Sequence, residues 1–190
     1  MKRILFVVSH IGSGSNKLIQ VLNQNPRVQI FITNTIYEHP KDLYNLLQFQ
    51  HKTDDNSAIY GDHLLFNSNL VSKSFYDICK FIYIIREAKA SLNLNTYHPK
   101  NKVESYYRFR LRRIYEMARS TKDAVFLDWD EIKSGKCFSQ LEDYLKLKMP
   151  LKLVVDMEEP YEERYDLATV SRAQDTYEKY SYKIKSILPK

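Results

Sequence analysis

One stretch near the amino terminus decides the fold of this chain. It reads Ile4-Leu5-Phe6-Val7-Val8-Ser9-His10-Ile11-Gly12-Ser13-Gly14-Ser15-Asn16-Lys17. Residues 4–8 are a continuous apolar run rich in β-branched side chains, which is typical of a parallel strand buried on both faces. Residues 9–15 are small and polar, and residues 16–24 place their leucines and valine at helical spacing. The stretch therefore predicts a strand, a tight loop and a helix.

This loop has the features of an anion-binding site. A glycine-bearing loop between a strand and a helix presents backbone N–H groups and the positive end of the helix dipole to one point, which favours phosphate or sulfate. Ser13, Ser15 and Asn16 can donate further hydrogen bonds, and Lys17 adds a full positive charge. The alternative is an ordinary turn in which Ser15 or Asn16 caps the helix.

The glycine content favours the anion site. The chain has only 4 glycines, whereas roughly 7% of residues is usual, and Gly12 and Gly14 fall in one three-residue window of the loop. Each glycine in such a chain marks a backbone shape that other residues adopt poorly. The loop is not a Walker A motif, because no glycine precedes Lys17 and Leu18 occupies the Ser/Thr position.

Strand and helix patterns alternate along the rest of the chain. Further strands are expected at residues 28–32, 58–60, 81–85, 124–127 and 151–155. Further helices are expected at residues 41–50, 64–75, 88–97, 103–120, 138–147 and 168–188. This alternation predicts an α/β fold with a mostly parallel sheet. In such sheets the ligand lies beyond the carboxyl ends of the strands, so the residues that follow each strand are the candidates for a site.

A basic residue follows the second strong strand of the chain. Arg86 comes directly after the apolar residues 81–85, and Ser91 lies close behind it. An arginine at the carboxyl edge of a sheet can bind a second phosphate through two parallel hydrogen bonds. The alternative is an ion pair with Glu87 or with a nearby aspartate.

A histidine follows the short strand at residues 58–60. His63 has an unperturbed pKa near neutrality, which suits a general base. The alternative is a structural histidine whose hydrogen bonds are satisfied in the fold. Asp62 either orients this imidazole or caps the helix that is expected to follow.

The composition indicates one globular domain over residues 1–190. Hydrophobic residues make up 44% and charged residues 27% of the chain, which excludes a collagen-like repeat, a wholly disordered chain and a membrane bundle. No apolar run approaches the ~20 residues that span a bilayer, so no membrane partner is expected. Two cysteines are too few for a disulfide framework, which favours a reduced, cytoplasmic protein. The histidine spacing predicts no metal site.

The positive charge of the chain leaves several partners open. The formal net charge is +6, which permits nucleotides or other anions without choosing among them. The helix at 103–120 carries five arginines interleaved with aromatic residues: Arg108, Arg110, Arg112, Arg113 and Arg119. We expect mixed core and surface roles for this helix, with no nucleic-acid partner, because no recognised nucleic-acid motif accompanies it.

The order and spacing of these segments resemble the sulfotransferase family over roughly residues 3 to 147. Residues 4–28 resemble the first strand, the 5′-phosphosulfate loop and the following helix, including the ending Leu22-Asn23-Gln24-Asn25-Pro26-Arg27-Val28. Residues 59–63 resemble the strand that ends in the catalytic histidine, and residues 81–92 resemble the 3′-phosphate strand and loop. Residues 125–132 resemble the later strand of the family.

The resemblance implies a three-layer α/β sandwich of the P-loop-like type and a 3′-phosphoadenosine 5′-phosphosulfate (PAPS) donor. Sulfuryl transfer to a hydroxyl of a small molecule, glycan or peptide would leave 3′-phosphoadenosine 5′-phosphate (PAP). It implies that His63 is the catalytic base and that Lys17 neutralises charge on the bridging oxygen. The implied donor ligands are Gly12, Ser13, Gly14, Ser15, Asn16, Lys17, Arg86 and Ser91.

Two departures from the family concern the donor site. Gly12 falls where the family has a catalytic Lys or Arg, so Lys17 or another cation must take that role. Leu94 falls on the second 3′-phosphate ligand of the family, a serine, for which Ser91 or Asn95 is the candidate substitute.

A third departure keeps other functions open. The C-terminal glycine-rich segment of cytosolic members is missing, and Arg108 or Arg112 is the candidate to compensate for it. A nucleotide or nucleoside kinase on a related fold is one alternative, although the missing Walker pair counts against it. A nucleotide-binding protein without catalytic activity is the other.

Overall fold

Five parallel strands form the centre of the molecule in a computed structural model that describes residues 3–31, 58–65, 76–77, 79–92, 103–153 and 165–188. The strands are β1 (Arg3–Val8), β2 (Val28–Phe31), β3 (Ile59–Leu64), β4 (Cys79–Ile85) and β5 (Ala124–Asp128). They lie in the order β2-β3-β1-β4-β5, and all the neighbouring pairs are parallel. All five carboxyl ends therefore lie at one edge of the sheet.

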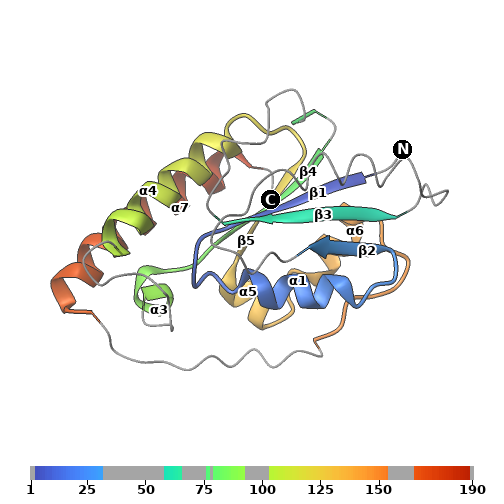
Figure 1. Cartoon of the computed structure of the whole chain (residues 1–190), viewed down its shortest axis with the longest axis horizontal. Helices are drawn as coiled ribbons and strands as arrows, with labels where there is room; N and C mark the ends of the chain where they lie inside the picture. The colour runs from blue at the N-terminus through green and yellow to red at the C-terminus, as the bar shows by residue number, and fades with distance from the viewer. Residues whose placement is uncertain are drawn as a thin grey trace.

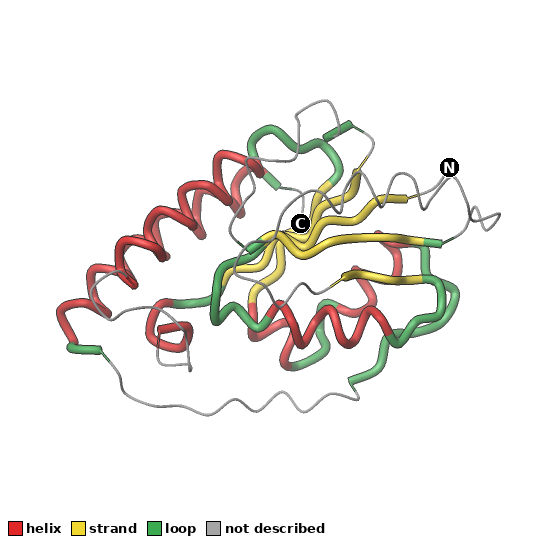
Figure 2. Tube along the Cα trace, in the orientation of Figure 1, coloured by secondary structure: helices red, strands yellow, loops and turns green. Residues whose placement is uncertain are grey.

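Helices cover both faces of this sheet (Figure 1). They are α1 (Ser15–Asn23), α3 (Ala88–Leu92), α4 (Val103–Ala118), α5 (Trp129–Lys133), α6 (Phe138–Leu145) and α7 (Leu167–Ile187). Figure 2 shows α4 and α7 as a pair on one side of the strands, with α1, α5 and α6 on the other. The predicted three-layer α/β architecture is confirmed.

Two apolar cores follow from the alternation of side chains along the buried strands. Ile4, Phe6 and Val8 of β1 pack into the core beneath α4 and α7. Leu5 and Val7 point to the opposite face and pack with the apolar side chains of α1, α5 and α6. Because β1 is buried on both faces, its sequence is a continuous apolar run and not an alternating one.

Most of the expected elements occur close to their expected places, and β3 is the main correction. The short strand expected at 58–60 extends to Leu64, so Asp62 and His63 lie inside it and Asp62 caps no helix there. Gly61 allows this extension, since a Cβ at that position would lie 2.2 Å from the carbonyl oxygen of Leu5 on β1. Two buried polar residues in succession conceal this central strand from pattern analysis.

Other differences are smaller. Residues 151–153 form no strand, and α5 was not expected. Asp128 and Glu131 make a capping box that starts α5 directly at the end of β5. The helix expected at 41–50 lies outside the described residues. The helix expected at 64–75 does not start at Leu64, which belongs to β3, and its residues 66–75 lie outside the described residues.

Within the described part of the chain, no helix is long and apolar enough to cross a membrane. The same residues contain no cluster of His, Cys, Asp and Glu side chains that could hold a metal ion. Cys79 and Cys137 are buried free thiols, and burial raises the pKa of each to about 12.

Candidate functional site

The loop between β1 and α1 is packed without spare room at the carboxyl edge of the sheet. Gly12 has φ 76° and Gly14 has φ 82°, in the left-handed region that favours glycine. A Cβ on Gly12 would lie 2.5 Å from the carbonyl oxygen of Ser91, and a Cβ on Gly14 would lie 2.1 Å from ring carbons of Trp129. Both glycines are therefore required by the backbone shape and by close neighbours.

Replacing Gly14 with alanine is expected to lower the free energy of unfolding by about 3 kcal/mol, because a strained backbone and an overlap with the Trp129 ring act together. Gly135→Ala is the matched control. Gly135 also has a positive φ, 71°, but its Cβ would meet the Phe138 ring at an ordinary 3.5 Å, so only the backbone cost of about 1 kcal/mol applies. Urea unfolding of the two variants measures the difference, and equal losses would contradict the packing described here.

The loop is joined to the end of β4 by His10 and Arg86. The backbone N–H of Arg86 donates to Nε2 of His10 at 2.9 Å, and Nδ1 of His10 donates to the carbonyl oxygen of Ile11 at 2.8 Å. The Arg86 guanidinium donates to the carbonyl oxygen of Gly12 at 3.4 Å and lies 4.9 Å from the Trp129 ring centroid. Arg86 therefore faces the loop. Sequence analysis did not single out His10, although its place two residues after a buried strand was a usable signal.

Helix α4 holds three strand ends together from one side. Tyr106 accepts the N–H of Ile11 at 3.2 Å, and Tyr107 donates to the carbonyl oxygen of Arg86 at 2.6 Å. Arg110 is 1% exposed and donates to the carbonyl oxygen of Ser9 at 2.7 Å and to that of Leu64. The inner face of this arginine-rich helix therefore connects β1, β3 and β4, in agreement with its expected mixed core and surface role.

His63 is completely buried beside the same loop. Its Nε2 lies 2.8 Å from Ser9 Oγ, and the Ser9 hydroxyl donates to Ser15 Oγ at 2.9 Å. Its backbone N–H donates to a carboxylate oxygen of Asp62 at 2.7 Å, whereas Nδ1 has no hydrogen-bond partner among the residues that the structure describes. Burial, assisted by the positive charge of Arg110, lowers the pKa of His63 to about 3. The imidazole is therefore neutral at pH 7.

A cavity of about 400 Å³ lies at this point. It is lined by His10, Ile11, Gly12, Gly14, Ser15, Asn16, Lys17, Gln20, His63 and Leu65. The structure thus brings most of the predicted loop residues, including Lys17, to one cavity with His63. Residues separated by more than forty positions in the sequence meet because β1 and β3 are neighbours in the sheet.

Three predicted donor ligands do not line this cavity. Ser13 is buried, and its hydroxyl accepts the N–H of Ser15 at 3.4 Å. Ser91 donates its hydroxyl to the carbonyl oxygen of Glu87 at 2.8 Å inside α3. Arg86 packs against the loop from the side of Trp129. Their donor-binding roles stay predictions, and Asn95 lies outside the described residues.

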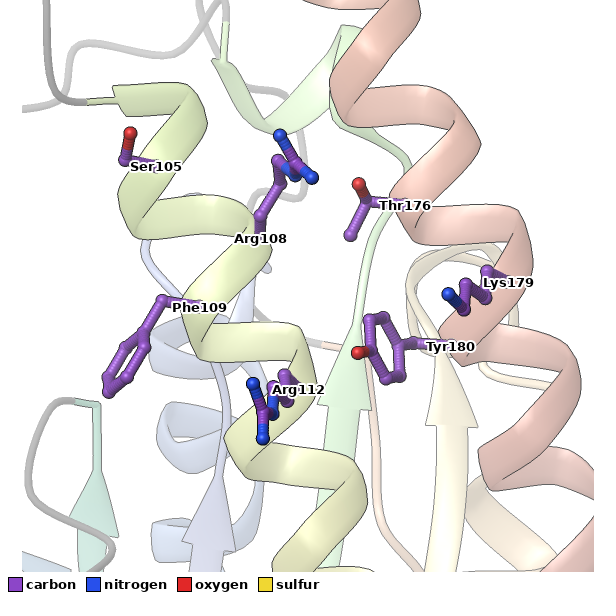
Figure 3. A pocket seen from close by; sticks show the side chains of 7 residues that line it. All are labelled: Ser105, Arg108, Phe109, Arg112, Thr176, Lys179 and Tyr180. Carbon is purple, nitrogen blue, oxygen red and sulfur yellow. The ribbon is translucent and has the colours of Figure 1, made fainter.

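Arg108 and Arg112 line a different cavity. Figure 3 shows them with Lys179 and Tyr180 between α4 and α7, in a groove of about 380 Å³. Arg108 pairs with Glu104 at 3.4 Å. Both arginines point away from the inner face of α4 that carries Arg110, so neither lines the loop cavity.

Comparisons with known proteins identify the fold. No family model matches the chain, and a comparison with curated proteins finds no match. Among solved structures, the crystal structure of mouse sulfotransferase SULT7A1 complexed with PAP matches with a TM-score of 0.51 and 15% sequence identity. The fold is sulfotransferase-like. The match covers 92% of this chain and 64% of the mouse chain, so the chain spans slightly less than two thirds of that protein.

Proposed function

We propose that this protein transfers a sulfuryl group from PAPS to an acceptor hydroxyl. One observation carries the proposal: the β1–α1 loop, Lys17 and His63 line a single cavity, with Arg86 packed on the same loop, at the carboxyl edge of a sulfotransferase-like sheet. Ligands in parallel α/β sheets bind at this edge. The solved neighbour is complexed with PAP, the nucleotide that such a transfer would release.

The loop side of the cavity suits the phosphosulfate of the donor. Backbone N–H groups at the start of α1 and the helix dipole favour an anion there. Gly12 and Gly14 line the cavity with backbone atoms alone, and Ser15 and Asn16 offer polar side chains to it. Lys17 adds a positive charge that can offset the charge that grows on the bridging oxygen as the S–O bond breaks.

The other proposed ligands do not line the cavity. Ser13, within the loop, is a proposed ligand of the phosphosulfate. Arg86, with Ser91 in α3, is the proposed ligand of the donor's 3′-phosphate. The contacts of Arg86 with Gly12 support this role, since they place its guanidinium next to the loop that would hold the phosphosulfate.

His63 is the proposed base. The acceptor oxygen attacks sulfur, its proton passes to the imidazole, and the electron pair of the breaking S–O bond leaves with PAP. The low pKa of His63 keeps the imidazole neutral, but it also makes the imidazole a weak base in the empty cavity. The anionic donor, bound in the same cavity, would partly cancel the positive charge of Arg110 and so raise the proton affinity of His63.

Replacing His63 with alanine is expected to lower kcat by about 100-fold or more, the usual contribution of a general base, while the Kd for PAP changes little. The measurement is transfer of labelled sulfate from PAPS to a panel of phenol and sugar hydroxyls. Calorimetry with PAP serves as the control for folding and donor binding. A variant that transfers at the full rate would refute the assignment of the base.

Binding without catalysis is the second candidate, and two observations favour it. Gly12 stands where the family has a catalytic cation, and His63 is closed to solvent. Such a protein would bind PAP and transfer no sulfate to any acceptor of the panel, so the same assay distinguishes it.

A further inference from the structure

Two serine hydroxyls form a hydrogen-bonded chain with Nε2 of His63. Ser9 Oγ lies 2.8 Å from Nε2 of His63 and donates to Ser15 Oγ at 2.9 Å. A hydroxyl has a single proton. When Nε2 of His63 carries the proton, it donates to Ser9 Oγ, and the single Ser9 proton goes to Ser15 Oγ. Nδ1 is then the unprotonated nitrogen.

The burial of Nδ1 supports the same tautomer. Nδ1 is buried and has no hydrogen-bond partner in the described part of the chain. A proton there would create a buried N–H donor without an acceptor, which costs about 1–3 kcal/mol. An unused acceptor lone pair is tolerated better than an unused donor. Both ends of the imidazole therefore favour Nε2–H.

Ser9 is held rigidly enough to impose this choice. It is fully buried at the end of β1. Its N–H donates to the carbonyl oxygen of Leu64 at 3.2 Å, and its own carbonyl oxygen accepts from Arg110 at 2.7 Å. The backbone of Ser9 is thus fixed between β3 and α4, and its hydroxyl meets the imidazole from a defined direction.

We propose that Ser9 is a positioning residue that, together with Ser15, holds His63 in the Nε2–H tautomer so that Nδ1 receives the proton of the acceptor. The inference rests on the proposed function. The acceptor O–H bond breaks as its oxygen bonds to sulfur, the proton joins the Nδ1 lone pair, and the S–O electron pair leaves with PAP. Because Nδ1 is buried, this transfer requires the acceptor hydroxyl to reach Nδ1 from the cavity that His63 lines. Nε2–H keeps its bond to Ser9, whose oxygen stabilises the imidazolium that forms.

The tautomer can be read directly by NMR of the full chain with ¹⁵N-labelled histidine. Correlations between ring nitrogens and ring protons distinguish Nε2–H from Nδ1–H, and His63→Ala assigns the His63 signals. The wild type is expected to show the Nε2–H form alone. Ser9→Ala is expected to show both forms. Ser15→Ala frees the Ser9 proton for Nε2 and is expected to shift His63 toward Nδ1–H.

Ser181→Ala is the matched control, because it removes a buried serine of α7 outside the cavity and is expected to leave the tautomer unchanged.

Once an acceptor is identified, Ser9→Ala is expected to lower kcat about tenfold at constant KM, since the wrong tautomer of a catalytic histidine impairs proton transfer. An Nδ1–H wild type, or an unchanged tautomer in both Ser9→Ala and Ser15→Ala, would overturn the inference. If Ser9→Ala fails to fold, Ser15→Ala alone decides it. Loss of the proposed function is a separate result, because the NMR measurement needs neither donor nor acceptor.

Discussion

Replacing Arg110 with methionine is expected to lower the free energy of unfolding by about 3 kcal/mol, because a buried charged hydrogen-bond donor serves two backbone carbonyls. Arg110 donates to the carbonyl oxygens of Ser9 and Leu64. Methionine fills a similar volume without those bonds, so the Ser9 carbonyl loses its donor in a place that water does not reach. Urea unfolding of the wild type and the variant measures the loss.

Arg112→Met is the matched control for this substitution. Arg112 lies on the same helix, but its side chain is 67% exposed and pairs with Glu116 at the surface. Exposed ion pairs of this kind contribute about 0.5 kcal/mol or less. If both variants lost the same stability, Arg110 would not be the residue that joins the strand ends.

Acidification is expected to destabilise the protein steeply below pH 6.5. Burial, with a contribution from the Arg110 charge, lowers the pKa of His10 to about 4 and that of His63 to about 3. In the unfolded chain both titrate near 6.5. Between these pKa values the unfolded chain binds more protons than the folded protein does. The contribution of the two histidines to stability is therefore fully present above pH 6.5 and is lost as the pH falls toward 4. Each histidine contributes about 1.4 kcal/mol per pH unit to the slope of the free energy of unfolding against pH.

The slope is measured by urea unfolding between pH 7.5 and pH 5. His63→Ala is expected to lose about half of the histidine-dependent part of the slope, and the histidines common to both proteins cancel in the comparison. A variant whose slope equals that of the wild type would mean that His63 is exposed enough to be protonated in the folded protein.

Much of the loop side of the candidate site could be predicted from the sequence. The strand, loop and helix of residues 4–24 follow from local patterns, and parallel strands must end at one edge. That rule was enough to expect Arg86 beside the loop that contains Gly12 and Gly14, and the structure places its guanidinium in contact with Gly12. This step needs no knowledge of which distant side chains are in contact, because the topology of a parallel sheet brings the strand ends together.

The support for the site was harder to predict, because it depends on contacts between distant residues. Arg110 and Arg112 are both arginines in one helix, and composition does not separate them. Their helical positions do: Arg110 shares a face with Tyr107, Leu111 and Ile114, which are buried. The Ser9–His63 contact depends on the extension of β3, and the buried polar residues of that strand obscured it.

The central claim is that two separate strand ends form one cradle for a single nucleotide with phosphates at both ends. Calorimetric titration with PAP, with adenosine 5′-phosphate and with Mg·ATP tests it most directly. We expect PAP to bind at least tenfold more tightly than the other two, and Arg86→Ala to abolish the preference for PAP over adenosine 5′-phosphate, because a guanidinium that pairs with the 3′-phosphate is worth at least this factor. Equal affinity of the wild type for PAP and adenosine 5′-phosphate, tighter binding of Mg·ATP, or a preference that survives in Arg86→Ala would contradict the account.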